Sequence, residues 1–260
     1  MRMGPVGGGL GVGGIVLLLL YSALTGQNPL DLVGNVAPTE EVAPTGAPAS
    51  DPQAQFISVT LKSTEDVWTK VFADHGAAYQ QPVLVLFTGA TQSACGLGES
   101  AMGPFYCPGD RKVYLDLSFF QELADRFGAP GDFARAYVVA HEVGHHLQTL
   151  TGISDRVAAA RQQGDRVSGN ALSVRQELQA DCYAGVWGHY AARDGLLEPG
   201  DAEDGLRAAA AIGDDRLQKQ SQGRVVPESF THGSSAQRVE WLRRGLENGR
   251  MEACDTFAAR

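Results

Sequence analysis

Three histidines and a glutamate lie close together in an otherwise apolar stretch of the chain, residues 136–148. Residues 141–145 of that stretch read HEVGH, with the two outer histidines four positions apart. On a helix this spacing places both on one face, so His141 and His145 can bind one metal ion through their ring nitrogens. Glu142 would lie beside the metal, where a carboxylate can take a proton from an attacking water and pass it to a leaving amine. The pattern predicts a zinc-dependent hydrolase.

The residues around this motif favour a metal site over a chance cluster of surface histidines. Apolar residues such as Val143 and Leu147 flank the histidines, and no proline interrupts the predicted helix. Gly144 costs a helix about 1 kcal/mol relative to alanine, so we expect a neighbouring backbone or a ligand to approach closely there. His146 follows His145 directly and is expected to face away from the metal.

Two histidines leave zinc without a third protein ligand, and residues 173–187, SVRQELQADCYAGVW, supply a candidate. Glu177 can bind the metal, and Asp181, one helical turn later, can accept the outer N–H of a ligating histidine and fix its orientation. His141, His145, Glu177 and one water would complete a four-coordinate catalytic zinc site. An exposed acidic face is the alternative, but the CYAGVW that follows indicates a buried segment whose carboxylates need a cation.

A further histidine precedes the last predicted helix, within residues 227–242, PESFTHGSSAQRVEWL. His232 can donate a hydrogen bond to the oxyanion that forms during peptide hydrolysis, with Arg238 as a neighbouring support. A residue that only opens the helix is the alternative, and the sequence leaves both open. His75 and His189 are expected to be structural or on the surface.

The N-terminal residues 1–30 differ in kind from the rest of the chain. No charge lies between Met3 and Leu30, and a helix needs about 20 apolar residues to cross a bilayer. Arg2 precedes this span and acidic residues follow it, so the positive-inside rule places the N-terminus in the cytoplasm and the rest outside. A cleaved signal peptide is the alternative, although YSALTG is a poor cleavage site. We predict a single-pass cell-membrane protein whose catalytic domain is periplasmic or at the cell surface.

Residues 31–55 are rich in proline and alanine and have little to bury, which predicts a flexible linker. The folded metallopeptidase domain is expected to span residues 56–260. The net charge is −9 and the sequence contains no basic run, so nucleic acid is excluded as a partner.

Hydrophobic periodicity predicts an α+β domain, mainly helical and with a small β-sheet. Strands are expected at residues 82–89 and 112–118, where β-branched and aromatic residues cluster or alternate. Ser63 and Thr64 are expected to cap the first helix. Helices are predicted at residues 65–75, 119–127, 133–150, 154–163, 172–193, 201–222 and 236–247.

The four cysteines are even in number and fall on the predicted outer side of the membrane, which favours disulfides. Cys95 and Cys107 flank one loop and form the natural pair. Cys182 with Cys254 would tie the C-terminus to a core helix. Four cysteines permit three pairings, and four reduced cysteines in a cytosolic domain are the alternative. No CxxC occurs, so a cysteine metal site is not expected.

Several stretches together resemble the neutral zinc metallopeptidases of bacteria, many of which are membrane-anchored. The resemblance implies a zincin-type fold with His141 and His145 as zinc ligands, Glu142 as catalytic base and Glu177 as third ligand. It rests on CGLGESAMGPFYCPGDRKVYLDLSFF (residues 95–120), GDFARAYVVAHEVGHHLQ (131–148), ALSVRQELQADCYAGVW (171–187) and FTHGSSAQR (230–238).

The chain is also distantly similar to the integral-membrane zinc proteases that include the prenyl-protein protease. That similarity implies that the third ligand comes from the E-x-x-x-D of Glu177 and Asp181. It also implies that a later histidine and arginine, here His232 and Arg238, line the site.

These observations predict a membrane-anchored metalloendopeptidase that holds one Zn²⁺ and cleaves a protein or peptide substrate. Residues 112–116, KVYLD, are the candidate edge strand for binding substrate as an added strand. A catalytically silent tethered scaffold that keeps the zincin fold is one alternative, although it would have no use for Glu142. A zinc amidohydrolase acting on cell-envelope material is another, since its metal chemistry would be the same.

Overall fold

The computed structural model describes residues 51–99, 103–125, 128–129 and 131–258. The predicted membrane anchor and most of the predicted linker lie outside the described residues, so both stay predictions. Among the described helices, none has the length and apolar composition that a membrane span requires.

Helix α3 (Pro52–Asp74) opens the described part of the chain and begins before residue 56, the predicted start of the domain. Its N-cap is Asp51, whose side chain accepts hydrogen bonds from two backbone N–H groups of the first turn. Such a cap satisfies donors that the helix itself leaves unpaired. The predicted cap at Ser63 and Thr64 is wrong, because Thr64 is buried within the helix.

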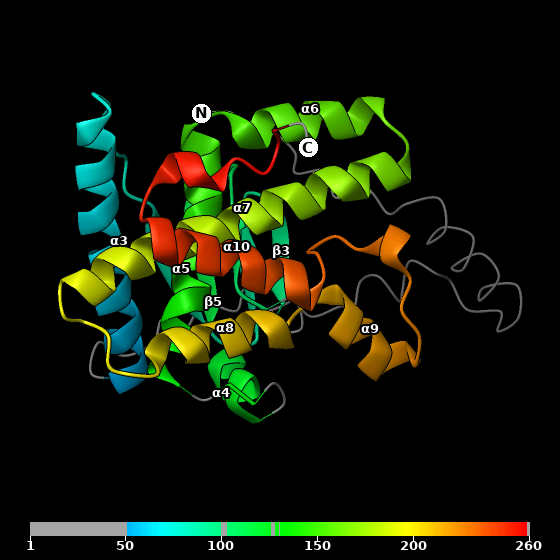
Figure 1. The fold of residues 1–260 in the computed structure, drawn as a ribbon. Coiled ribbons are helices and arrows are strands. Elements are labelled where there is room, and N and C mark those ends of the chain that lie inside the picture. The colour runs from blue at the N-terminus through cyan, green and yellow to red at the C-terminus, as the bar shows by residue number, and fades with distance from the viewer. Residues whose placement is uncertain (1–50, 100–102, 126–127, 130, 259–260) are drawn as a thin grey trace, which may run out of the picture. The chain divides into compact units, whose positions relative to one another are not determined.

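The strands form two small sheets (Figure 1). One sheet has three strands in the order β1-β5-β4, with β1 parallel and β4 antiparallel to β5. The other is an antiparallel hairpin of β2 and β3. The strands are β1 (Val83–Phe87), β2 (Ala90–Ser93), β3 (Gly96–Glu99), β4 (Phe105–Cys107) and β5 (Lys112–Asp116).

The prediction that residues 112–116 form an edge strand is wrong. These residues are β5, the central strand, which pairs with β1 along its whole length and with β4 over residues 112–114. The edges of this sheet are β1 and β4. β4 was missed because three residues beside a glycine-rich cysteine loop are too short to show strand alternation.

Helices make up most of the described residues, which confirms the α+β class. The helix predicted at residues 201–222 is in fact two, because the chain turns at Gly213, where any side chain would collide with the backbone of Ser235. Besides α3, the helices are α4 (Leu117–Asp125), α5 (Asp132–Leu150), α6 (Ile153–Gln163), α7 (Arg166–Arg193), α8 (Asp201–Ala211), α9 (Asp214–Gln222) and α10 (Ser235–Asn248), with short 3-10 turns η2 (Pro227–Ser229) and η3 (Met251–Cys254).

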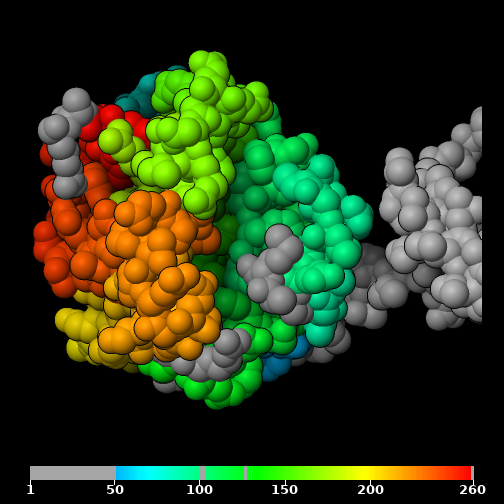
Figure 2. Space-filling model, turned by 90° about the vertical axis from the view of Figure 1, so that its right-hand side faces the viewer, coloured from blue at the N-terminus to red at the C-terminus, as the bar shows by residue number. Residues whose placement is uncertain are grey.

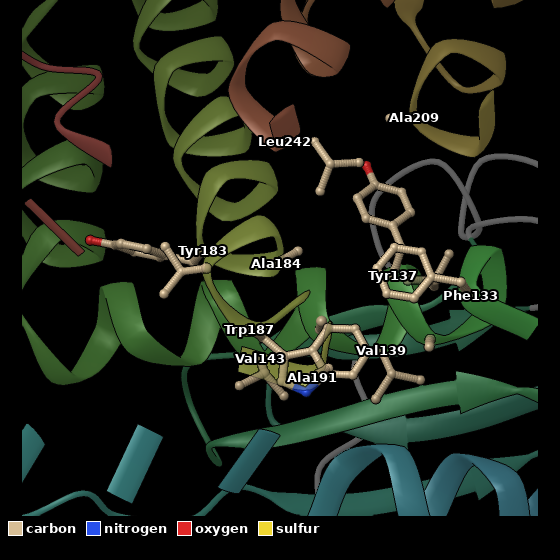
Figure 3. Close-up of a cluster of buried hydrophobic side chains, with 14 of the residues drawn as sticks. Phe133, Tyr137, Val139, Val143, Tyr183, Ala184, Trp187, Ala191, Ala209 and Leu242 are labelled. Atoms are coloured by element: carbon tan, nitrogen blue, oxygen red, sulfur yellow. The ribbon is translucent and has the colours of Figure 1, made fainter. Parts of the chain in front are cut away.

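Helix α5 is central to this arrangement. It packs against β4 and β5 and also against α3, α7 and α8 (Figure 1). Its apolar residues join those of α7 in one core, where Phe133 of α5 stacks on Trp187 of α7 with ring centroids 5.6 Å apart (Figure 3). Tyr137, Val139 and Val143 continue this core along α5 (Figure 3).

Small residues bring the helices of the core unusually close together. A Cβ atom on Gly144 of α5 would lie 2.9 Å from the Cα atom of Ala180 in α7, inside normal van der Waals contact. The close backbone approach predicted at Gly144 is therefore confirmed. A second close crossing joins α7 to α10, where a Cβ on Gly185 would lie 2.9 Å from the Cα of Gly245.

Both predicted disulfides, Cys95–Cys107 and Cys182–Cys254, are confirmed. Cys95, in the turn between β2 and β3, is bonded to Cys107 of β4, with Cα atoms 5.8 Å apart. Cys182 of α7 is bonded to Cys254 of η3, with Cα atoms 5.5 Å apart. The first disulfide holds the hairpin to edge strand β4, and the second holds the C-terminal turn to the core.

Candidate metal centre

The close crossing of α5 and α7 brings three candidate ligands together. His141 and His145 lie on α5, and Glu177 lies on α7, one turn before Asp181. The Nε2 atoms of His141 and His145 are 3.2 and 3.4 Å from the carboxylate oxygens of Glu177. One ligand atom from each residue lies within 4.8 Å of the others.

The outer nitrogen of His141 contacts the carboxylate of Asp181. Nδ1 of His141 donates to Oδ1 of Asp181 over 2.8 Å, which leaves Nε2 free to face Glu177. Arg238 donates to both oxygens of Asp181 from Nε and Nη2, each over 2.9 Å, and the hydroxyl of Tyr137 donates to Oδ1 over 2.6 Å. Burial opposes ionisation of Asp181, but Arg238 and His141 outweigh it and lower the pKa of Asp181 to about 2.

Arg238 is engaged by this buried network and not by His232, beside which the sequence places it. Its guanidinium also donates to the hydroxyl of Tyr137 over 3.1 Å and to the backbone carbonyl of Ile212. Tyr137 is a member that sequence reasoning missed. Its position four residues before His141 on the same helical face was the available signal.

The outer nitrogen of His145 has a different partner, which sequence reasoning also missed. Nδ1 of His145 lies 2.9 Å from Oε1 of Gln148, one turn later on α5. Gln148 is fully buried. The two candidate histidine ligands are thus oriented by unlike groups, one by a carboxylate and the other by a neutral amide.

Glu142 is buried, and its side chain lines the same cleft as His141 and His145. Burial raises the pKa of Glu142, and the charges of the two histidines oppose this effect. A carboxyl group whose pKa is raised toward neutrality is suited to accept and then return a proton near pH 7.

His232 lies in the loop before α10 and lines the same cleft. Asp214, a residue that sequence reasoning missed, anchors this loop. Its Oδ2 atom accepts hydrogen bonds from the backbone N–H groups of Thr231, His232 and Gly233. Its Oδ1 atom lies 3.3 Å from Nδ1 of His232. This contact raises the pKa of His232.

The other histidines have structural partners. His146 faces away from Glu177, as predicted, and is fully buried: Nε2 contacts the carbonyl of Gln80 over 2.6 Å, and Nδ1 contacts the hydroxyl of Tyr106 over 3.1 Å. This contact ties edge strand β4 to the helix that carries the candidate ligands. His75 pairs with Glu252 at the surface, and His189 contacts the carbonyl of Leu246.

The candidate ligands line a cleft of about 600 Å³. Residues 103–106, which include the start of β4, form one wall, and α6, α9 and the His232 loop contribute to the rest. Figure 2 shows the hollow between the orange surface of α9 and the blue-green surface around β2 to β4. The side chain of Glu142 is among the residues that line this cleft.

The donor set fits zinc. Two imidazoles and one carboxylate are the ligands of many catalytic zinc sites, and each histidine has an outer partner that fixes its ring. Without a metal, the carboxylate of Glu177 lies against the Nε2 atoms of the two imidazoles, where protons on the rings favour its charged form. A divalent cation would replace those protons at the point where the three side chains meet.

Comparison with known proteins agrees with this geometry. The family model described as "Putative neutral zinc metallopeptidase" matches residues 2–257. The chain belongs to this family. All the candidate site residues fall within the matched range.

Bacterial relatives match along most of the chain. The chain is 51% identical over 251 residues to "Uncharacterized protein YpfJ" of Escherichia coli K12, covering 95% of this chain and 87% of that protein. It is 44% identical over 246 residues to "Uncharacterized protein Rv2575" of Mycobacterium tuberculosis, covering 90% and 81%. No solved structure matches the chain.

Proposed function

We propose that this member of the family is a zinc metalloendopeptidase that hydrolyses peptide bonds of a protein or peptide substrate. The observation that supports it most is the meeting of His141, His145 and Glu177 at the wall of an open cleft, with Glu142 lining the same cleft. A purely structural metal site would need neither the cleft nor the neighbouring base.

His141, His145 and Glu177 would hold the zinc ion, which would act as a Lewis acid that polarises a carbonyl and makes water easier to deprotonate. Glu142 accepts the proton of the attacking water and then delivers it to the nitrogen of the leaving amine. Asp181 and Gln148 hold the two imidazoles in the tautomer that presents Nε2 to the metal. Arg238 balances the charge of Asp181, so that this carboxylate orients His141 without acting as a ligand itself.

His232 is proposed to stabilise the oxyanion that develops on the scissile carbonyl. Its side chain is 53% exposed and lines the cleft, so it can reach a bound peptide. Asp214 fixes the loop and raises the pKa of His232, which favours a protonated donor near neutral pH. A donor positioned before the reaction starts stabilises developing charge without reorganisation.

We propose that β4 binds the substrate as an added strand. It is an edge of the three-stranded sheet and borders the cleft, which is the geometry that strand addition needs. The contact of Tyr106 with His146 and the disulfide at Cys107 hold β4 in a defined position beside α5.

We further propose that the catalytic domain lies on the outer side of the cell membrane, held by residues 1–30. The two disulfides support this location, since disulfides persist in oxidising compartments. The acidic composition gives no support for nucleic acid as a partner.

The test compares full-length protein with its Glu142→Gln variant for zinc content and for cleavage of casein and a mixed-peptide library. We expect one zinc per chain in both proteins and cleavage only by the parent. Zinc in both without cleavage by either would favour a tethered scaffold, and cleavage of envelope amides but not peptides would favour an amidohydrolase. A parent that binds no zinc would refute the ligand assignment.

A further inference from the structure

The position of the proton on His145 is set by a chain of buried amides that runs away from the cleft. The amide of Gln148 can present either oxygen or nitrogen to Nδ1 of His145. Its Nε2 atom donates to the backbone carbonyl of Gln176 over 2.7 Å, so its oxygen must face His145. If the amide were flipped, two carbonyl oxygens would face each other in a buried site.

Gln179 of α7 continues this chain. Its Oε1 atom accepts the second N–H of Gln148 over 3.1 Å, and its own Nε2 atom donates to the backbone carbonyl of Cys254 over 3.0 Å. Gln179 is 4% exposed. The backbone carbonyl of Cys254 thus fixes the direction of the Gln179 amide, because carbonyls accept and never donate, and Gln179 together with the carbonyl of Gln176 fixes that of Gln148.

The far end of the chain is held by a disulfide. Cys182 lies one helical turn after Gln179 on the same face of α7. That face therefore holds η3 through two bonds: the hydrogen bond from Gln179 to the carbonyl of Cys254 and the Cys182–Cys254 disulfide. Both cysteines are fully buried. A hydrogen bond from the hydroxyl of Thr256 to the carbonyl of Arg175, over 2.6 Å, adds a third tether after η3.

We infer that Gln148 and Gln179 are positioning residues for the metal ligand His145, and that the Cys182–Cys254 disulfide makes zinc affinity depend on the oxidation state of the protein. The inference rests on the proposed metal centre. Oxidation forms one S–S bond and passes two electrons and two protons from the thiols to a disulfide-bearing oxidant, which becomes a dithiol. With the thiols reduced, η3 is freer and the carbonyl of Cys254 holds Gln179 less firmly. Gln148 keeps its bond to the carbonyl of Gln176 but loses the firm support of Gln179, so the ring of His145 is held less rigidly.

Through this coupling the chain binds zinc about fivefold more tightly once the Cys182–Cys254 disulfide has formed. The second disulfide provides an internal control, since Cys95–Cys107 joins the hairpin to β4 and contacts neither glutamine. Loss of either disulfide removes one cross-link, but only loss of Cys182–Cys254 acts on His145.

The experiment measures the Kd for zinc by competition with a chromophoric chelator, on full-length protein. The variants are Gln148→Leu, Gln179→Leu, the pair Cys182→Ala/Cys254→Ala, and the control pair Cys95→Ala/Cys107→Ala. We expect Kd to rise about tenfold or more in Gln148→Leu, as for other outer-shell partners. It should rise about fivefold in Gln179→Leu and in Cys182→Ala/Cys254→Ala, as for coupled members of one network. The control pair should keep the parent Kd.

The decisive comparison combines Gln179→Leu with Cys182→Ala/Cys254→Ala in one protein. Gln179→Leu retains both disulfides, and removal of Cys182–Cys254 in that background should change Kd no further, because the chain is already broken. Additive losses, or an equal loss in the control pair, would mean that the disulfide acts only through general stability and would overturn the inference. An oxidised parent without zinc would instead refute the metal centre itself, which keeps the two failures distinct.

Discussion

Replacing Gly144 by alanine tests whether the α5–α7 crossing positions the metal centre. The new Cβ atom would lie 2.9 Å from both the Cα and carbonyl oxygen of Ala180, and 3.1 Å from its Cβ. Carbon atoms in contact prefer separations of about 3.5–4.0 Å, and two of the three neighbours are backbone atoms that cannot rotate away. The helices must therefore separate by several tenths of an ångström.

Gly169, also helical and also buried, supplies a matched control. A Cβ atom there would approach nothing closer than the Arg161 side chain, 3.8 Å away. Gly169→Ala should stabilise the fold by about 0.5–1 kcal/mol through helix propensity alone. Gly144→Ala gains the same propensity but carries an overpacking cost of about 1–3 kcal/mol. The difference between the two variants isolates that steric cost.

The assay is urea unfolding of the metal-free proteins, followed by zinc titration of each. We expect the free energy of unfolding of Gly144→Ala to fall about 1–3 kcal/mol below that of Gly169→Ala. Its Kd for zinc should also rise, because Glu177 moves relative to His141 and His145, and metal ligands need placement within about 0.5 Å. Equal unfolding midpoints and equal Kd values in the two variants would show that the crossing is not what sets the site.

Three further outcomes follow from the charges around the centre. Arg238→Met leaves Asp181 buried without its cation and should lower the free energy of unfolding by about 3–5 kcal/mol. Tyr137→Phe removes one neutral hydrogen-bond donor and should lower it by about 1 kcal/mol. Equal losses for the two variants in chemical denaturation would contradict this order. Because Asp214 raises the pKa of His232, the protonated form persists above the usual value, and its contribution is lost as the pH rises through the raised pKa. Asp214→Asn keeps an oxygen that can accept from the loop N–H groups but removes the negative charge. The basic limb of the pH profile of kcat/KM should therefore move to lower pH. If that limb does not move, the protonation of His232 does not contribute to catalysis. Burial opposes protonation of His141, but Asp181 and Glu177 raise its pKa to about 10 in the metal-free protein. Zinc must displace that proton, so the affinity for zinc should fall about tenfold per pH unit below neutrality for each proton displaced. Calorimetry in buffers of different ionisation enthalpy measures the number of protons released. An affinity that does not change with pH would contradict this expectation.

Local sequence patterns predicted the helix of the HEVGH motif, because its apolar flanks and the four-residue spacing of its histidines can be recognised in a short stretch of sequence. They also singled out Glu177 and Asp181, whose four-residue spacing places both on one face of α7. Gln148 could not be recognised, since a glutamine in a helix is most often a surface residue and becomes informative only when the crossing with α7 buries it. Asp214 and His232 are 18 positions apart, and only the turn at Gly213 brings them together.

Several features that sequence reasoning missed depend on how separate segments of the chain meet. β4 is recognisable as an edge only once β5 is seen to pair on both sides. Gly144 belongs to both kinds of feature. A glycine within a helix is unusual and can be recognised in the sequence, and its missing side chain is what lets α7 approach α5 in the fold. A larger residue at that position would hold Glu177 away from the histidines even with every ligand intact. The candidate metal centre therefore depends as much on the absence of a side chain at Gly144 as on the presence of His141, His145 and Glu177.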